Sequence, residues 1–376
     1  MMMKSKYLAV ALSAVALTAC NNEDVLEVNQ GRGISFQVAT EASTRATATT
    51  TSTIDNFKVW GFTDGKTLMN GIEVSKSGSE WTYDGTIFWP ATEVDFYSVS
   101  PAEDCGGTVN ITENAQTITN FTVNTDQSKQ VDLLYAVNKG ETKANHEASP
   151  VSINFRHALS QIVFKAKNTN DNLKVIVKGV TIANIKKAGD FTYPAQATTV
   201  HNNSTTGSIV ATTQGTWNNV STAEKFSAGM DAAGVTLDGK VETAKDLSNA
   251  TGALFMIPQA LTPWNPSTEG CNKSNNVYFL LNCQILSGTN KDIQVWPSDA
   301  DETFAEIAVP ANTLTWEQGK KYVYTFIFGE GAGYEPGENP NPDPTLVGID
   351  FDVTVDEFIA VTPDQDIDMS TEDDGE

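Results

Sequence analysis

Apolar and polar residues alternate with a period of two along most of this chain, and this pattern is the feature that most constrains its fold. The clearest stretches lie at 57–62, 94–99, 151–155, 162–166, 173–185, 277–286, 307–309 and 322–328. Turn sequences such as Asp64-Gly65 separate them. Short alternating strands with turns between them are typical of β-sandwiches, so we expect an all-β protein. Weak helical patterns occur only near 222–233 and 242–249.

The length indicates more than one hydrophobic core. The chain has 376 residues, which suits two domains of roughly 150–180 residues each. The polar stretch 138–149 is the best candidate for the boundary between two tandem sandwiches.

Two alternating strands stand apart from these sandwiches. The first is 34–38, and the second is 349–355, in which one face is apolar and the other polar. Each is joined to the rest of the chain by a polar tether. The tether before the second strand, 329–344, is rich in Gly, Pro and Asn, so we expect it to run extended.

The first twenty residues resemble an export signal rather than part of the fold. Lys4 and Lys6 precede an apolar stretch, 7–17, which is too short to span a bilayer permanently. The stretch ends in Leu17-Thr18-Ala19-Cys20, which resembles a bacterial lipobox. We therefore expect Cys20 to carry acyl chains such as palmitate and to anchor the mature protein. The acidic stretch 21–24 resembles the one that follows the lipidated cysteine in surface lipoproteins of Bacteroidetes-type bacteria.

The charge of the chain argues against a nucleic-acid partner. The formal net charge is −23, and fifteen acidic residues but no lysine or arginine follow Lys321. Only three of the 24 basic residues are arginines, and two of them, Arg32 and Arg45, flank the strand at 34–38. A chain so poor in arginine is not expected to bind phosphate backbones. The tail at 363–376 is expected to be solvated.

No sequence motif indicates catalysis. The chain lacks HExxH, a Gly-x-Ser-x-Gly elbow, a phosphate-binding loop and a dinucleotide fingerprint. The three histidines are scattered, and His157 is expected to have a structural role. We therefore expect no enzyme activity, no cofactor and no metal site.

Neither the cysteines nor a segment that resembles a calcium-binding loop indicates a metal site. Three cysteines beyond the leader allow at most one intrachain disulfide, and the sequence leaves open whether any of them pair: Cys105, Cys271 and Cys283. The segment 364–375 has the acidic spacing of a calcium loop, but Met369 stands where the turn requires glycine.

Seven motifs follow one another along the chain: "TRAT" (44–47), "FKVWGF" (57–62), "WTYDGTIFWP" (81–90), "VDLLYA" (131–136), "FRHALSQIVF" (155–164), "FMIPQ" (255–259) and "WEQGKKYVYTF" (316–326). In this order they resemble the fimbrillins and Mfa-like surface lipoproteins of Bacteroidales, the subunits of type V pili. The resemblance spans nearly the whole mature chain. It implies two tandem transthyretin-like β-sandwich domains with a detachable N-terminal strand and a C-terminal donor strand.

The resemblance also implies a maturation step. In that family an arginine-specific outer-membrane protease cuts the lipoprotein precursor downstream of its first strand. Carried over to this chain, the cut falls between Arg45 and Ala46, because a cut at Arg32 would leave the strand in place. The strand that leaves carries three apolar side chains: Ile34, Phe36 and Val38. The groove is then filled by a strand of the next subunit, whose apolar side chains are Ile349, Phe351, Val353 and Val355.

Burial favours such a replacement. Three apolar side chains contribute roughly 5–9 kcal/mol when buried, and four contribute roughly 6–12 kcal/mol. The implied organisation is a signal peptide (1–20), a propeptide with the first strand (21–45), an N-terminal sandwich (46–145), a C-terminal sandwich (146–328), a Gly/Pro spacer (329–344), a donor strand (345–361) and an acidic tail (362–376).

The implied function is a stalk or accessory subunit of a type V fimbrium that assembles by proteolysis-triggered strand exchange and mediates cell adhesion. Its implied partners are other pilin subunits and the arginine-specific protease, and its implied place is the outer membrane and the fimbrium on the cell surface.

Other interpretations of the same residues stay open. The strand 34–38 fits an ordinary edge strand, Arg45 an ordinary loop arginine, and 349–355 a strand that folds back onto its own domain. The alternative function is a monomeric glycan-binding lipoprotein of the same surface. The seven tryptophans could form a sugar platform, but three of them lie at alternating positions that favour core packing: Trp60, Trp81 and Trp89.

Overall fold

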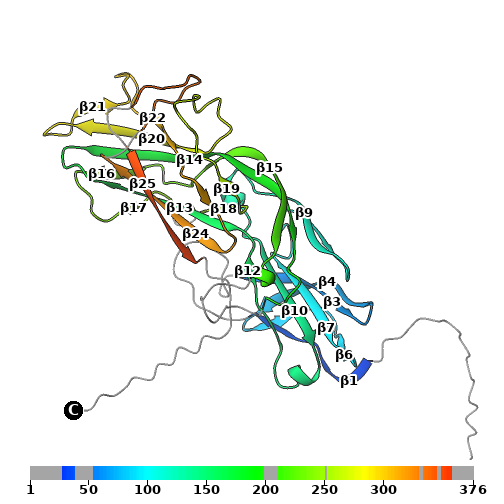
Figure 1. Cartoon of the computed structure of the whole chain (residues 1–376). Coiled ribbons are helices and arrows are strands. Elements are labelled where there is room, and N and C mark those ends of the chain that lie inside the picture. The colour runs from blue at the N-terminus through cyan, green and yellow to red at the C-terminus, as the bar shows by residue number, and fades with distance from the viewer. Residues whose placement is uncertain are drawn as a thin grey trace, which may run out of the picture.

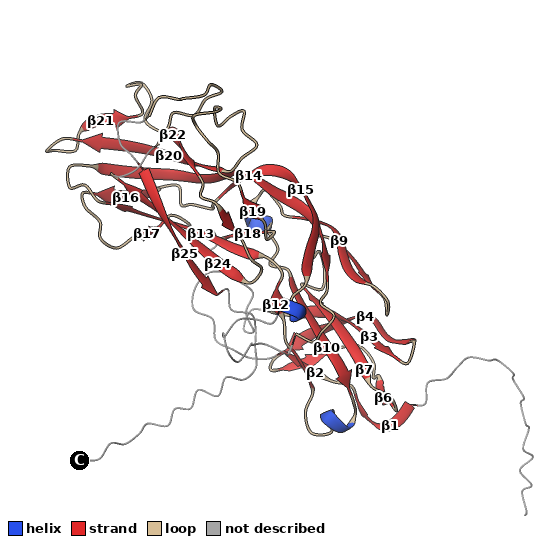
Figure 2. Cartoon of the chain, in the orientation of Figure 1, coloured by secondary structure: helices blue, strands red, loops and turns tan. Residues whose placement is uncertain are grey.

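A computed structural model describes residues 28–38, 54–198, 211–249, 252–329, 333–344 and 349–357, which form an elongated all-β molecule (Figures 1 and 2). The all-β prediction is confirmed, since these ranges contain three short 3₁₀ helices and no α-helix. The two weak helical patterns are wrong, because residues 222–227 belong to β15 (Thr216–Ser227) and 245–246 form β17 (Lys245–Asp246). Strand pairing outweighs a weak local helical preference. The 3₁₀ helices are η1 (Gln127–Lys129), η2 (Ala144–His146) and η3 (Ala211–Thr213).

The N-terminal half is built on a six-stranded sheet with the order β12-β10-β7-β3-β4-β5. Its strands are β3 (Asn56–Thr63), β4 (Lys66–Ser77), β5 (Glu80–Thr82), β7 (Val94–Ser100), β10 (Leu134–Glu141) and β12 (Arg156–His157). Two short pairs complete this half: β1 (Val28–Gly33) with β6 (Phe88–Pro90), and β2 (Phe36–Val38) with β11 (Val151–Ile153).

The C-terminal half contains two larger sheets and one short pair. The eight-stranded sheet comprises β8 (Thr108–Ile111), β9 (Gln116–Thr122), β14 (Lys174–Thr192), β15, β16 (Val235–Asp238), β20 (Tyr278–Ser287), β21 (Ile293–Trp296) and β22 (Ala305–Pro310). The five-stranded sheet comprises β13 (Ser160–Asn168), β17, β18 (Leu254–Met256), β24 (Lys320–Phe328) and β25 (Ile349–Glu357). The short pair is β19 (Ala260–Leu261) with β23 (Leu314–Thr315).

Strand β14 pairs with strands that come from both sides of residue 145 in the sequence (Figure 1). Its first part pairs with β20, from Lys174 opposite Leu286 onward, and its last part pairs with β9, which precedes residue 145 in the chain. Strands β11 and β12, which follow residue 145, pair with β2 and β10. Strands from before residue 145 therefore pair with strands from after it in both parts of the fold. The long strand β14 takes part in this pairing.

The middle strands of the six-stranded sheet, β3, β7 and the first part of β10, are buried on both faces, which explains why they are mostly apolar. In β7, Phe96 faces one hydrophobic cluster with Phe57 and Phe155, and Tyr97 faces the other with Tyr135. The first cluster lies within the N-terminal half. The second continues without a break into the core of the C-terminal half.

The Gly/Pro-rich segment does not run extended, contrary to expectation. In its described part, 333–344, the backbone of Tyr334 exchanges two hydrogen bonds with Ala308, at 2.8 and 2.9 Å. The Tyr334 ring packs against Trp264 with a centroid distance of 5.7 Å, and a bridge between Tyr334 and Pro344 turns the segment back on itself. Packing of the Tyr334 ring and further backbone hydrogen bonds, such as that from the Asn272 N–H to the Gly337 carbonyl at 3.0 Å, together offset the loss of chain entropy.

A buried arginine fixes the junction near β12. Arg156 is 3% exposed, and its Nη2 donates to the Thr198 carbonyl at 2.8 Å while its Nη1 donates to the Thr213 carbonyl at 2.9 Å. Asn154 Nδ2 donates to the same Thr198 carbonyl at 2.8 Å. A planar guanidinium can reach both carbonyls at once because its donors diverge.

We predict that Arg156→Lys lowers the free energy of unfolding by about 2–4 kcal/mol, because one ammonium cannot replace the forked donors and leaves a buried carbonyl unpaired. Urea denaturation of the uncleaved chain measures this change. Lys273→Ala is the control, since its exposed ion pair with Glu338 is expected to be worth less than about 1 kcal/mol. Equal midpoints for the two variants would contradict the assigned role of Arg156.

Candidate functional site: the β2 groove and the C-terminal strand

The three apolar residues predicted for the first strand lie in the core of the N-terminal half. Ile34, Phe36 and Val38 are 3%, 2% and 6% exposed. The Phe36 ring packs edge-on against Phe96 at 5.4 Å and Phe57 at 6.2 Å between centroids. Residues 34–38 therefore fill a groove lined by aromatic side chains.

Backbone pairing holds the segment on one side. Strand β2 runs parallel to β11, with Phe36 opposite Val151 and Val38 opposite Ile153, and the Val151 N–H donates to the Ser35 carbonyl at 2.8 Å. The sheet formed by β2 and β11 has only these two strands among the described residues. The segment is thus held by one short ladder and by the burial of its side chains.

Tyr83 closes the other side of the groove. Its Oη donates to the Ile34 carbonyl at 2.7 Å and accepts from the Ile87 N–H at 3.4 Å, while the Ile34 N–H donates to the Ile87 carbonyl at 2.8 Å. The Tyr83 ring lies 6.1 Å from that of Phe36. Burial raises the pKa of Tyr83 above its ordinary value, so the hydroxyl keeps its proton and remains a donor at neutral pH.

The C-terminal strand lies on its own half of the molecule. Strand β25 pairs antiparallel with β24 along nine residues, from Phe328 opposite Ile349 to Lys320 opposite Glu357. The fold-back that the sequence left open is therefore the observed arrangement. In Figure 2, β25 and β2 lie in opposite halves of the chain.

The apolar side chains of β25 become less buried from Ile349 to Val355. Ile349 is 1% exposed, Phe351 and Val353 are half-buried, and Val355 is 50% exposed. The Phe351 ring packs against Phe279 at 5.4 Å. The apolar face of β25 is thus only partly used within one chain.

Several predicted residues lie outside the described ranges. Cys20, Arg45, Ala46 and the calcium-like segment 364–375 are among them. Arg32 lies in the backbone of β1, a strand that the sequence analysis did not predict. Among the described residues, no helix combines the length and hydrophobicity needed to traverse a bilayer.

The three described cysteines and His157 are buried. Cys105, Cys271 and Cys283 are buried and form no disulfide, and burial raises the pKa of each thiol. His157 is 1% exposed, and its Nδ1 lies 2.8 Å from Asp132 Oδ1. The structural role expected for His157 agrees with this burial.

The three tryptophans of the alternating stretches pack in or against the core. Trp60 and Trp89 are 8% and 1% exposed, and Trp81 packs half-buried against Phe57 with a centroid distance of 5.3 Å. Core packing, which the alternating pattern favoured, is confirmed for Trp60 and Trp89.

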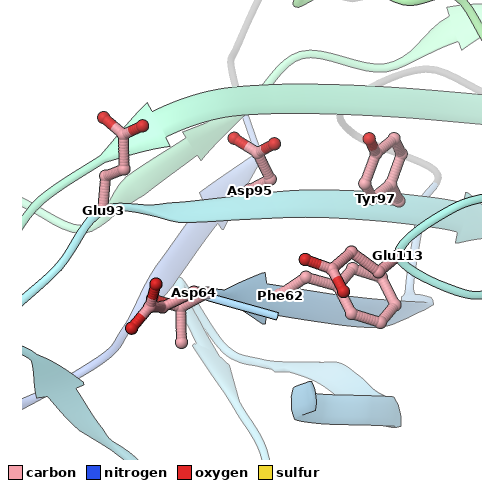
Figure 3. A pocket seen from close by; sticks show the side chains of 7 residues that line it. Phe62, Asp64, Glu93, Asp95, Tyr97 and Glu113 are labelled. Atoms are coloured by element: carbon pink, nitrogen blue, oxygen red, sulfur yellow. The ribbon is translucent and has the colours of Figure 1, made fainter. Parts of the chain in front are cut away.

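A small acidic pocket of about 110 Å³ opens beside β7 (Figure 3). Asp64, Glu93, Asp95 and Glu113 contribute carboxylates to its lining, and Asp95 and Tyr97 project from the same strand. Asp95 already accepts from Lys139 Nζ at 2.9 Å. No group of His, Cys, Asp or Glu side chains in the described ranges is arranged to hold a metal ion.

The sequence predicted a strand at 151–155 but not its pairing with β2, and it gave no sign that Tyr83 completes the groove. Tyr83 stands 49 residues from its partner Ile34, and β11 is more than a hundred residues from β2. Neither residue type nor spacing signals such a distant pairing.

Comparison with known proteins agrees with this architecture. The chain is 23% identical over 374 residues to "Fimbrium subunit Fim1C" of Phocaeicola vulgatus, covering 88% of this chain and 94% of that protein. A crystal structure of a fimbrial protein from Bacteroides vulgatus is similar in fold, with a TM-score of 0.57, 16% identity and coverage of 88% of this chain and 100% of the other. The sequence pattern described as fimbrillin-like matches residues 44–355, which is most of the chain. This protein therefore belongs to the fimbrillin-like family.

Proposed function

We propose that this protein is a stalk or accessory subunit of a type V fimbrium that assembles by strand exchange. The observation that carries the proposal is the burial of Ile34, Phe36 and Val38 in a groove where β2 has one strand partner among the described residues. Cleavage between Arg45 and Ala46 separates this segment from the body of the chain. The C-terminal strand of a neighbouring subunit then takes its place.

Loss of β2 would leave a surface that demands a new partner. Phe57, Phe96 and Val151 would lose the apolar side chains that cover them, and the β11 edge would lose its ladder partner. An open edge beside an apolar groove is the arrangement that proteins use for strand addition.

The C-terminal strand has the side-chain spacing that the groove requires. Its apolar residues recur at every second position, as they do in 34–38. Val355 is half-exposed on β25, so part of its burial energy is still available to a contact with another chain.

The contact joins two different surfaces, a groove on one subunit and a strand on the next. Such a heterologous contact grows an open filament when it does not close into a ring. The subunit is exported, anchored through acyl chains on Cys20 in the outer membrane, and released from the anchor by the cut at Arg45. The name of the Phocaeicola vulgatus relative, a fimbrium subunit, supports this setting, and we assign the fibre a role in cell adhesion.

We predict that treatment of the purified precursor with an arginine-specific protease produces a ladder of multimers on SDS gels. Arg45→Ala is expected to abolish the ladder, because the first strand stays attached to the body of the chain. Arg32→Ala is the matched control and is expected to leave the ladder intact. The N-terminus of fibres sheared from cells should be Ala46, and fibres that still begin at Cys20 would refute the proposal.

We predict that Val355→Asp blocks growth of the ladder without unfolding the subunit. Val355 is 50% exposed in the single chain, so its replacement should change the free energy of unfolding by no more than about 0.5 kcal/mol. In a neighbour's groove the carboxylate would be desolvated, and the yield of multimers should fall at least about tenfold.

Ile293→Asp is the control for this variant, since Ile293 is 60% exposed on β21, away from both strands. Gel densitometry after protease treatment measures multimer yield for all three proteins. Normal ladders from Val355→Asp would show that the face of β25 is not what enters the groove.

We predict that Tyr83→Phe loosens the first strand in the uncleaved chain. The variant loses the hydroxyl that pairs with Ile34 and Ile87, at a cost of about 1 kcal/mol. Hydrogen exchange of the amides in β2 should accelerate by about fivefold, while those of β24 stay unchanged. Tyr334→Phe, in the other half of the molecule, serves as the control. Equal exchange rates of the β2 amides in the two variants would show that the Tyr83 hydroxyl does not help to hold β2 in the groove.

A further inference from the structure

Strand β25 is the last strand of its sheet among the described residues, and none of the described strands pairs with its outer edge. The order is β17-β13-β24-β25, so β25 pairs with β24 on one side and with no strand among the described residues on the other. The strand is nine residues long. An edge of this length is a template for pairing with another chain unless something closes it.

The register with β24 shows which backbone groups point outward. In an antiparallel ladder, the N–H and C=O groups of alternate residues point toward the partner, and those of the residues between them point away. Phe351 and Val353 stand opposite Phe326 and Tyr324. Their N–H groups donate to side-chain acceptors on β25 itself, which places both on the outer edge.

Each of these two N–H groups is capped by the aspartate that precedes it. Phe351 N donates to Asp350 Oδ1 at 2.8 Å, and Val353 N donates to Asp352 Oδ1 at 2.8 Å. Both aspartates are exposed. A hydrogen bond from an amide to a carboxylate is charge-assisted and stronger than one to a neutral acceptor.

We propose that Asp350 and Asp352 close the outer edge of β25 against pairing with the same edge of a second copy of this chain. A second copy is the relevant partner because two such edges are self-complementary when they pair antiparallel across a twofold axis. That pairing would require the Phe351 and Val353 N–H groups as donors. While the caps are in place these donors are occupied and cannot pair with a second copy. The device acts on the uncleaved chain and does not depend on strand exchange.

The test compares two double variants that separate capping from charge. Asp350→Ala with Asp352→Ala removes both the acceptors and the charges. Asp350→Asn with Asp352→Asn removes the charges but keeps a side-chain carbonyl that can accept the same hydrogen bonds. Asp84→Ala with Glu113→Ala is the control, because it removes two exposed negative charges that lie away from β25.

Sedimentation equilibrium of the uncleaved chains measures the association constant for dimers. The alanine pair is expected to raise it at least about tenfold over the unsubstituted chain, equivalent to about 1.4 kcal/mol. The asparagine pair and the control pair are expected to stay within about threefold of it. In dilute monomer, the amides of Phe351 and Val353 should exchange faster in the alanine pair, and the asparagine pair, whose neutral carbonyls can still accept, should show a smaller increase.

Two results would overturn the proposal. One is an alanine pair that associates no more strongly than the unsubstituted chain and keeps its exchange rates. The other is an asparagine pair that associates as strongly as the alanine pair, which would assign the effect to charge alone. Circular dichroism of each variant establishes that β-structure is retained, and the exchange measurement remains decisive if the alanine pair is destabilised.

Discussion

Burial of Phe36, together with Ile34 and Val38, between the aromatic side chains of the N-terminal half is the interaction on which the rest of the structure depends. Phe36 packs within 6.2 Å of Phe57 and Phe96, in the same cluster as Phe155. These rings cannot face water without cost, and the segment that covers them comes from a part of the chain before residue 39. This half of the fold is complete only while some strand occupies the groove, and that requirement links packing to the proposed assembly.

The C-terminal strand β25, unlike β2, has an apolar face that its own chain covers only in part. It covers Phe279 and Phe326 through Phe351, yet its apolar face is less buried toward the end, where Val355 is half-exposed. Its outer edge is occupied by its own aspartates. The strand is therefore stable on its own subunit, while part of its apolar surface is still uncovered.

Much of the candidate site could be predicted from the chain itself. The spacing of Ile34, Phe36 and Val38 predicted a buried face, and the alternation in 349–355 predicted a strand with one apolar side; both residue sets lie in strands or beside them, with the expected faces toward the core. The helical patterns near 222–233 and 242–249 and the extended spacer were wrong. In each case a contact far away in the chain, such as that of Tyr334 with Ala308, outweighed a local preference.

The sequence by itself determined that the protein is built of strands, which residues of each strand point inward, and that two strands are tethered apart from the rest. These properties are local, because side chains in a strand alternate between its two faces whatever its neighbour is. Only the tertiary structure decided which strands pair: β2 with β11, β14 with both β9 and β20, and β25 with β24. It also decided that Tyr83 closes the groove and that Asp350 and Asp352 cap an edge. Pairing depends on contacts between residues tens to hundreds of positions apart. An alternating pattern specifies the two faces of a strand but not which strand lies beside it.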